Sequence, residues 1–215
     1  MSSSAFIPFV EALESLDSAT FRTTMSQKGV RLDVACCNWQ SEYPYTPTVT
    51  AYMAYSKSAI AILFEVTESH TCAVEMADNG RVWEDSCVEL FIANPVGEGY
   101  FNFEMNAIKS LLAAKRLSRT DAVHFSDDLL MQIVRHGSFD NAPVDIRHQN
   151  SWWAGEVIPF TLLGVESMPE SLSVNIYKCG DNLLQPHYLS WSPITLDKPN
   201  FHCPEFFGTL IAKYE

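Results

Sequence analysis

Hydrophobic and polar side chains alternate most regularly in two neighbouring runs, Cys87–Ala93 and Tyr100–Asn106. A period of two residues is typical of a strand with one face on a core, so both runs are predicted to be strands. The segment between them, Asn94–Gly99, is rich in turn-forming residues, which indicates an antiparallel hairpin. The polar side chains expected together on its second face, toward solvent, are Glu89, Asn102, Glu104 and Asn106.

Further short runs of strand character recur along the chain, with Gly, Pro, Asn or Asp between them. They are Ala51–Tyr55, Ala59–Val66, Leu129–Arg135, Trp152–Pro159, Leu172–Lys178 and Phe206–Ala212. Helical periodicity is found at Phe6–Ser15 and Phe160–Val165. Many short strands predict an all-β fold, an antiparallel β-sandwich of the immunoglobulin or jelly-roll kind with short helical segments. We expect residues 1–16 to form an N-terminal arm and residues 17–215 to form one sandwich domain.

Composition and charge narrow the classes of partner. Hydrophobic residues make up 47% of the 215 residues and charged residues 19%, which is enough for a large core. The formal charge of −12 argues against nucleic acid and against an anionic membrane surface. No apolar stretch reaches the roughly 20 residues of a membrane helix, and no signal peptide is seen. The sequence therefore indicates a cytoplasmic location, although export by another route stays open. The oligomeric state also stays open.

Aromatic side chains gather in three proline-containing loops, Cys37–Pro47, Gly180–Pro193 and Asn200–Phe207. Restricted, aromatic-rich loops on a rigid sandwich are a common way to build a ligand site. These loops, together with the polar face of the hairpin, are therefore candidates for recognition. The six scattered cysteines form no CxxC motif and are expected to be free thiols.

Segments along nearly the whole chain carry a family resemblance. They are Asn38–Pro47, Val82–Ile92, Tyr100–Ile108, Tyr177–Asp181, His187–Ile194 and Phe201–Leu210. In this order they resemble the family 9 carbohydrate-binding modules, in the variant found as single-domain bacterial proteins. The resemblance implies a β-sandwich that binds a mono- or oligosaccharide between aromatic rings and takes part in carbohydrate catabolism beside glycoside hydrolases. It also implies structural calcium, whereas no cofactor is indicated by the residues themselves.

The resemblance also carries expectations for individual residues. Trp83 lies six residues before Glu89, which matches the spacing of a stacking Trp and a sugar-binding Glu in the family, and Trp191 is the expected second ring. The hydroxyl-binding residues are expected to be Glu89, Asn102, Glu104 and Asn106, with Tyr188 beside them. The family places an Arg and an Asn on the strand that here carries Asn102 and Glu104, so the identity of the sugar stays open.

The physics of sugar binding agrees with these residue types. A pyranose ring has apolar C–H faces on which aromatic rings stack, burying apolar area at roughly 25 cal/mol per Å². Its rim of hydroxyl groups suits carboxylates and amides, because an amide both donates and accepts hydrogen bonds. Calcium, which prefers oxygen ligands, could be held at Asp78–Asn79 or Glu84–Asp85.

Other classes of function remain open. A glycoside-active enzyme could use Glu89 and Glu104 as acid and base, because neighbouring strands bring such carboxylates within the required separation. An open sheet face excludes water poorly, however, and neither residue has an evident reason for a raised pKa. A haem protein is disfavoured because no CxxCH motif occurs. An intracellular interaction protein that keeps only the fold is a further alternative.

Overall fold

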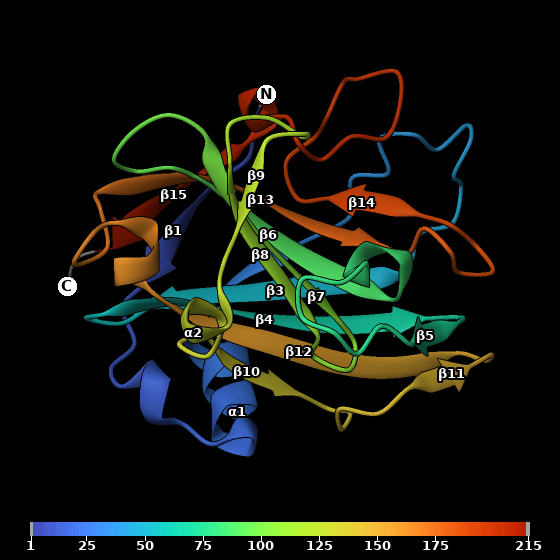
Figure 1. The fold of residues 1–215 in the computed structure, drawn as a ribbon, viewed down its shortest axis with the longest axis horizontal. Helices are drawn as coiled ribbons and strands as arrows, with labels where there is room; N and C mark the ends of the chain where they lie inside the picture. The colour runs from blue at the N-terminus through green and yellow to red at the C-terminus, as the bar shows by residue number, and fades with distance from the viewer. Residues whose placement is uncertain (1, 214–215) are drawn as a thin grey trace.

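The computed structural model describes residues 2–213, which form two facing β-sheets (Figure 1). The larger sheet has the order β1 (Ser4–Pro8), β15 (Gly208–Lys213), β13 (Ser171–Cys179), β6 (Cys87–Ala93), β7 (Tyr100–Asn106), β8 (Leu111–Arg116) and β9 (Ala122–His124), and β14 (Tyr188–Ser190) pairs with β13. The smaller sheet has the order β10 (Val134–Gly137), β12 (Asn150–Pro159), β4 (Ala59–Glu68), β3 (Thr48–Tyr55) and β2 (Val30–Asp33). A separate ribbon pairs β5 (Thr71–Ala73) with β11 (Val144–Ile146).

Helical structure is sparse in the described residues. The α-helices are α1 (Ser18–Lys28) and α2 (Asp127–Leu130), and 3₁₀ turns occur at Leu13–Ser15, Val82–Glu84, Phe160–Leu163 and Pro204–Phe206. Neighbouring strands pair antiparallel except for β1 and β15, which are parallel. The predicted fold class, an antiparallel β-sandwich with short helical segments, is confirmed. Within residues 2–213, no helix has both the length and the apolar character needed to span a bilayer.

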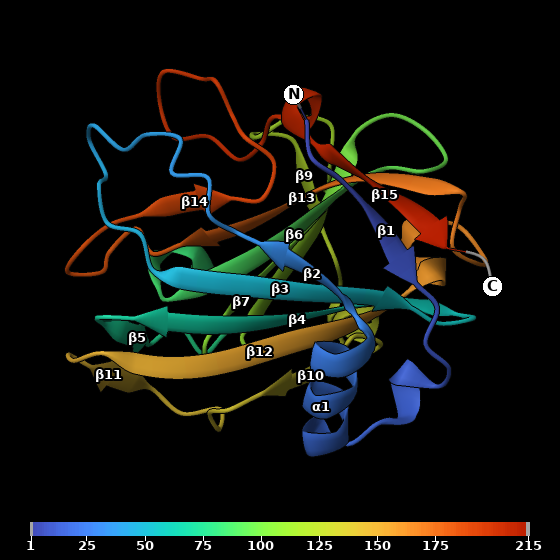
Figure 2. The ribbon, with the colours of Figure 1, turned by 180° about the vertical axis from the view of Figure 1, so that it is seen from behind.

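The main core lies between the two sheets. Alternate residues of β6 and β7, among them Leu90 and Phe103, point inward and belong to one cluster with Ile62 and Phe64 of β4. Figures 1 and 2 show the strands of the larger sheet running obliquely across those of the smaller one. This packing follows from the period-two pattern, since the hydrophobic face of each strand meets the hydrophobic face of the opposite sheet.

The outer face of the larger sheet is covered rather than solvated. Its residues Phe91, Tyr100 and Tyr177 form a second cluster with Trp39 and Phe201 from the loops. The prediction that the polar side of the hairpin faces solvent is therefore wrong, because its polar residues are buried. The exposed fractions are 3% for Glu89, 0% for Asn102, 4% for Glu104 and 0% for Asn106.

The outer face of the smaller sheet is covered by the N-terminal segment and by α1 (Figure 2). Phe21 and Met25 of α1 are buried there against β3, β4 and β12. Gly155 of β12 makes this approach feasible, because a Cβ at that position would lie 2.5 Å from the Phe21 ring. Asp17 caps α1 by accepting hydrogen bonds from the backbone N–H groups of Ala19 and Thr20.

Most predicted strands are confirmed with small shifts of their ends, and the hairpin of β6 and β7 has the predicted bounds. The predicted strand Leu129–Arg135 is wrong, because α2 precedes it and β10 begins only at Val134. The helix expected at Phe6–Ser15 is also wrong. Instead, β1 pairs with β15 in the larger sheet and a single 3₁₀ turn follows.

Candidate functional site

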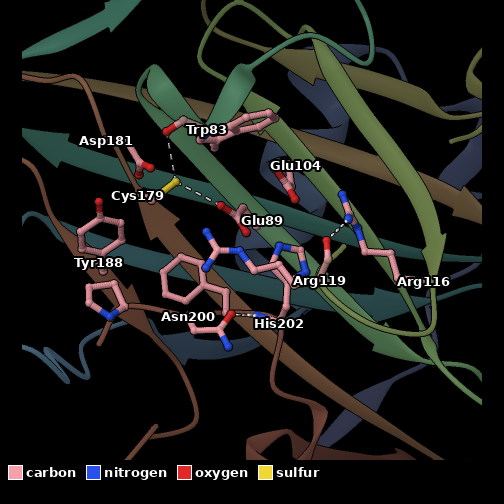
Figure 3. Close-up of a pocket in the computed structure, with 12 residues that line it drawn as sticks. Trp83, Glu89, Glu104, Arg116, Arg119, Cys179, Asp181, Tyr188, Asn200 and His202 are labelled. Carbon is pink, nitrogen blue, oxygen red and sulfur yellow. Dashed lines mark hydrogen bonds between the residues drawn. The ribbon is translucent and has the colours of Figure 1, made fainter. Parts of the chain in front are cut away.

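A cavity of about 310 Å³ opens on the outer face of the larger sheet (Figure 3). Its lining combines aromatic rings, carboxylates and cations. The aromatic residues are Trp83, Tyr188 and Phe201, the acidic residues are Glu89, Glu104 and Asp181, and the others are Arg116, Arg119, Cys179, Pro199, Asn200 and His202. The same figure shows Trp83 along one edge and Asn200 and His202 along the opposite edge.

Two carboxylates from neighbouring strands form the centre of the site. Glu89 of β6 is paired in register with Glu104 of β7, so both side chains leave the same face of the sheet. The thiol of Cys179 donates a hydrogen bond to Glu89 Oε1 at 3.0 Å, and Asn102 Nδ2 donates one to Glu104 Oε1 at 2.8 Å. Among the described residues, the second oxygen of each carboxylate accepts no hydrogen bond from a side chain or from the backbone.

Burial changes the protonation of this pair. It raises the pKa of Glu104 to about 7, although the hydrogen bond from Asn102 and the charge of Arg116 act in the opposite direction. Burial also raises the pKa of Glu89 well above its usual value, and the neighbouring Cys179 and Glu104 raise it further. The expectation that neither carboxyl has a reason for a raised pKa is therefore wrong. Near neutral pH the pair holds a proton, so it can donate as well as accept hydrogen bonds.

Two arginines that the sequence prediction missed line the same cavity. Arg116 ends β8 and lies diagonally beside Asn102, because Asn102 pairs in register with Ala114. Its Nε donates to Asn102 Oδ1 at 2.8 Å, and its Nη1 donates to the backbone carbonyl of Arg119, also at 2.8 Å. Asn102 therefore links Arg116 to Glu104. The available signal was the run from Leu111 to Arg116. Treated as a third strand after β6 and β7, this run places Arg116 on the outer face.

The loop that follows β13 supplies the acidic edge of the cavity. The backbone N–H of Asp181 donates to the carbonyl of Trp83 at 3.2 Å, which ties this loop to the Val82–Glu84 turn. Burial raises the pKa of Asp181, while a hydrogen bond from Tyr188 lowers it. Burial raises the pKa of Tyr188, so its hydroxyl stays protonated. Trp83 itself is half-buried, and the Arg81 guanidinium lies 6.0 Å from the centre of its ring.

A third loop completes the wall. Phe201 stacks on Tyr177 of β13 with ring centres 4.1 Å apart, which holds the loop against the sheet. His202 Nδ1 is hydrogen-bonded to the hydroxyl of Tyr100 at 2.8 Å. Burial lowers the pKa of His202 to about 3, and the charges of Arg116 and Arg119 act in the same direction. The imidazole is therefore neutral in this wall.

The predicted site residues divide into three groups. Trp83, Glu89, Glu104 and Tyr188 line the cavity, and Asn102 lies directly behind it between Arg116 and Glu104. Asn106 is engaged elsewhere, since its Nδ2 donates to Asp85 Oδ2 and to the carbonyl of Glu75 and its Oδ1 accepts from the Ser110 N–H.

Trp191 also lies apart from the cavity. It is buried in the cluster between the sheets. Its ring packs so closely on Gly208 that a Cβ at position 208 would lie 2.5 Å from it. Its backbone N–H donates to the carbonyl of Ile176. The structure therefore places Trp191 in the core, because the backbone at this position pairs with β13 and directs the ring inward. Phe201 and Tyr188 are the rings that the loops bring to the cavity.

Groups that could hold a metal ion occur at two places among residues 2–213. Cys87, Glu89 and Cys179 have ligand atoms within 4.8 Å of one another, and so do His70, Cys72 and Asp145. The expected calcium positions are engaged by the protein. Asp85 accepts hydrogen bonds from backbone N–H groups, and Asp78 is paired with Arg135 at 2.7 Å.

Comparison with known proteins adds to this geometry. The family model described as "Carbohydrate-binding family 9" matches residues 20–212. A candidate carbohydrate-binding protein from Bacteroides uniformis ATCC 8492 is 33% identical, with a TM-score of 0.92 over 99% of this chain and 100% of that one. A family 9 module from Caldicellulosiruptor kristjanssonii, solved with glucose and with cellotriose, shares the fold at 9% identity. Its TM-score is 0.60 over 99% of this chain and 97% or 95% of that chain. No curated protein matches the chain.

Proposed function

Because the chain belongs to carbohydrate-binding family 9, we propose that the cavity on its larger sheet binds a mono- or short oligosaccharide without converting it. The observation that carries this proposal is the composition of the cavity wall. Aromatic rings and hydrogen-bonding groups face one space, as the apolar faces and hydroxyl rim of a sugar require. The glucose and cellotriose complexes of a protein with the same fold support a saccharide as the class of ligand.

In this proposal a pyranose ring stacks on Trp83, whose half-buried ring forms one edge of the cavity. The rim hydroxyls then reach the free oxygens of Glu89 and Glu104 at the centre. The shared proton lets this pair donate to one hydroxyl and accept from another. The cavity lies at the lower end of the roughly 300–1,000 Å³ typical of small-molecule sites, which favours one or two sugar rings.

The test is a calorimetric titration with a panel of mono- and oligosaccharides, repeated on Trp83→Ala. We expect saturable binding by the wild type and a loss of about tenfold or more in the variant, because an aromatic contact contributes about 1 kcal/mol beyond its buried area. Trp153→Ala is the matched control, since Trp153 lies in the cluster on the outer face of the smaller sheet. Absence of binding to every saccharide, or equal affinity of wild type and Trp83→Ala, would refute the proposal.

A glycoside-active enzyme is the second candidate function. It is favoured by the register pairing of Glu89 with Glu104 and by the raised pKa of each carboxyl group. A retaining hydrolase needs two carboxyl groups about 5–5.5 Å apart, and neighbouring strands are about 4.8 Å apart. Turnover of aryl glycosides that disappears in Glu104→Gln would support this function. Unchanged residual turnover in Glu104→Gln would refute it.

A further inference from the structure

The arginines of this protein differ in their ion pairing. The sequence contains seven arginines, and five of them form ion pairs with carboxylates at 2.7–2.9 Å. These five are Arg22, Arg31, Arg81, Arg135 and Arg147. Within residues 2–213, Arg116 and Arg119 form no such pair, and both line the cavity. In a chain with a formal charge of −12, two unpaired guanidinium groups at one site need an explanation.

Within residues 2–213, neither arginine donates a hydrogen bond to a charged group. Arg116 donates to the amide oxygen of Asn102 and to a backbone carbonyl, so neither acceptor carries a charge. The Arg119 guanidinium donates no hydrogen bond to any of the described residues, and its side chain is exposed at the mouth of the cavity. Their positive charges reach His202, whose pKa they help to lower.

The nearby carboxylates are held by other donors. Glu104 accepts from Asn102 and Glu89 accepts from Cys179, so neither is drawn into an ion pair with the arginines. Asp181 lies on the side of the cavity away from Arg116 (Figure 3). Against the effect of burial, the charge of Arg119 lowers the pKa of Asp181, and that of Arg116 lowers the pKa of Glu104, so cations and carboxylates face the same space without forming an ion pair.

Resting on the proposed saccharide site, we infer that the ligand is an acidic saccharide whose oxyanion is bound by Arg116 and Arg119 while its hydroxyl groups face Glu89, Glu104 and Asp181. A guanidinium group matches the planar geometry of a carboxylate and can bind it through two parallel hydrogen bonds. The same pair suits a phosphate ester, so the shared chemistry is an oxyanion on a sugar ring. A neutral sugar would leave both guanidinium groups without a hydrogen-bonded anion as the ligand excludes water.

The experiment compares matched sugars by calorimetric titration of the wild type. D-Glucuronate against D-glucose, and D-galacturonate against D-galactose, differ only in the acidic group, and D-glucuronamide keeps the shape of glucuronate without its charge. We expect an acidic sugar to bind at least about tenfold more tightly than its neutral partner, as charge-assisted hydrogen bonds allow. The preference should shrink at high salt because ions screen exposed charges. Glucose 6-phosphate tells a phosphate ligand from a carboxylate ligand.

Arg119→Gln tests the residue without disturbing the fold, because the Arg119 side chain makes no hydrogen bond to residues 2–213. The backbone carbonyl of residue 119, which accepts a hydrogen bond from Arg116, is kept. In this variant the affinity for glucuronate should fall to about the affinity for glucuronamide. Lys115→Gln is the control, since it removes an equal charge from an exposed neighbour that does not line the cavity. It should leave the preference unchanged.

The outcomes separate this inference from the proposed function. Equal or weaker binding of the acidic sugars, with neutral sugars bound, would overturn the inference and leave saccharide binding intact. An acidic preference that survives in Arg119→Gln, or that falls equally in Lys115→Gln, would also overturn it. Tighter binding of glucose 6-phosphate than of glucuronate would support the inference and identify phosphate as the oxyanion. Binding of neither class would refute the proposed function itself.

Discussion

Glu156 is a carboxyl group inside the sandwich, and its titration should govern stability between mildly acidic and neutral pH. Its side chain is 2% exposed and lies on the face of β12 that also carries Ala154 and Ile158 of the main core. Burial raises the pKa of Glu156 to about 7 from its ordinary 4.5, and the charge of Arg135 opposes this only in part. Its Oε2 has no hydrogen-bond partner among the described residues.

The sign of the effect follows from proton binding. Below about pH 4.5 the group is protonated in both states, and between 4.5 and 7 the unfolded chain loses the proton while the folded protein keeps it. The folded state then binds more protons, so stability falls as the pH rises through this window. At about 1.4 kcal/mol per pH unit, the shift corresponds to about 3 kcal/mol of lost stability above neutral pH.

The perturbation that tests this reasoning is Glu156→Gln, which keeps the shape and removes the titration. Urea denaturation, followed by tryptophan fluorescence, gives the free energy of unfolding at about pH 5 and about pH 8. Relative to the wild type, the variant should gain about 3 kcal/mol between these two values. Glu166→Gln, in an exposed loop, controls for removal of one carboxyl group. A difference between wild type and Glu156→Gln that is the same at both pH values would refute the argument.

Lys178→Met should lower the free energy of unfolding by about 3–5 kcal/mol, because it leaves Glu68 as an unpaired charge in the interior where the two groups now lie 3.0 Å apart. Urea denaturation should show recovery in the double variant Lys178→Met/Glu68→Gln. Acidic saccharides should bind more weakly as the pH rises above 7, since ionised Glu104 then faces the ligand. Calorimetric titration of Glu104→Gln should show a smaller change, because only Glu89 of the pair is left to titrate. A chelator should leave the Tm unchanged in scanning calorimetry, because Asp85 and Asp78 already have protein partners. A rise in Tm on adding calcium would contradict this.

Alternation along the chain was enough to predict the sandwich and the central hairpin. In β6 and β7 the inward residues are uniformly apolar, so the period of two is visible in the sequence. The same reasoning failed at α1. This helix buries little more than Phe21 and Met25, four residues apart, and its other side chains are mostly small and polar. Its N-cap, Asp17, was the remaining signal.

The site was only partly accessible from the sequence for a related reason. Glu89 and Glu104 lie in one local hairpin, and Trp83 lies in the turn just before it. Their proximity therefore follows from strand pairing. Arg116 comes from β8, where Leu111–Ala114 are all apolar, so its face can be assigned only by treating this run as the next strand after β7. The inward position of Trp191 depends on the pairing of its backbone with β13, which sequence periodicity does not encode.

The cover on the larger sheet bears on how buried carboxylates would serve the proposed saccharide site. On an open sheet face, Glu89 and Glu104 would be solvated, and each hydrogen bond to a sugar would replace one to water with little net gain. Here the loops that carry Phe201 and Tyr188 pack in one cluster with Tyr177 and Phe91 and leave a cavity above the two carboxylates. The stack of Phe201 on Tyr177 is part of the cluster on this face, so this wall of the cavity is positioned by packing within the protein. A site ordered in this way loses little conformational entropy on binding, and its affinity should therefore depend on the packing beneath the loops as much as on the groups that contact the ligand.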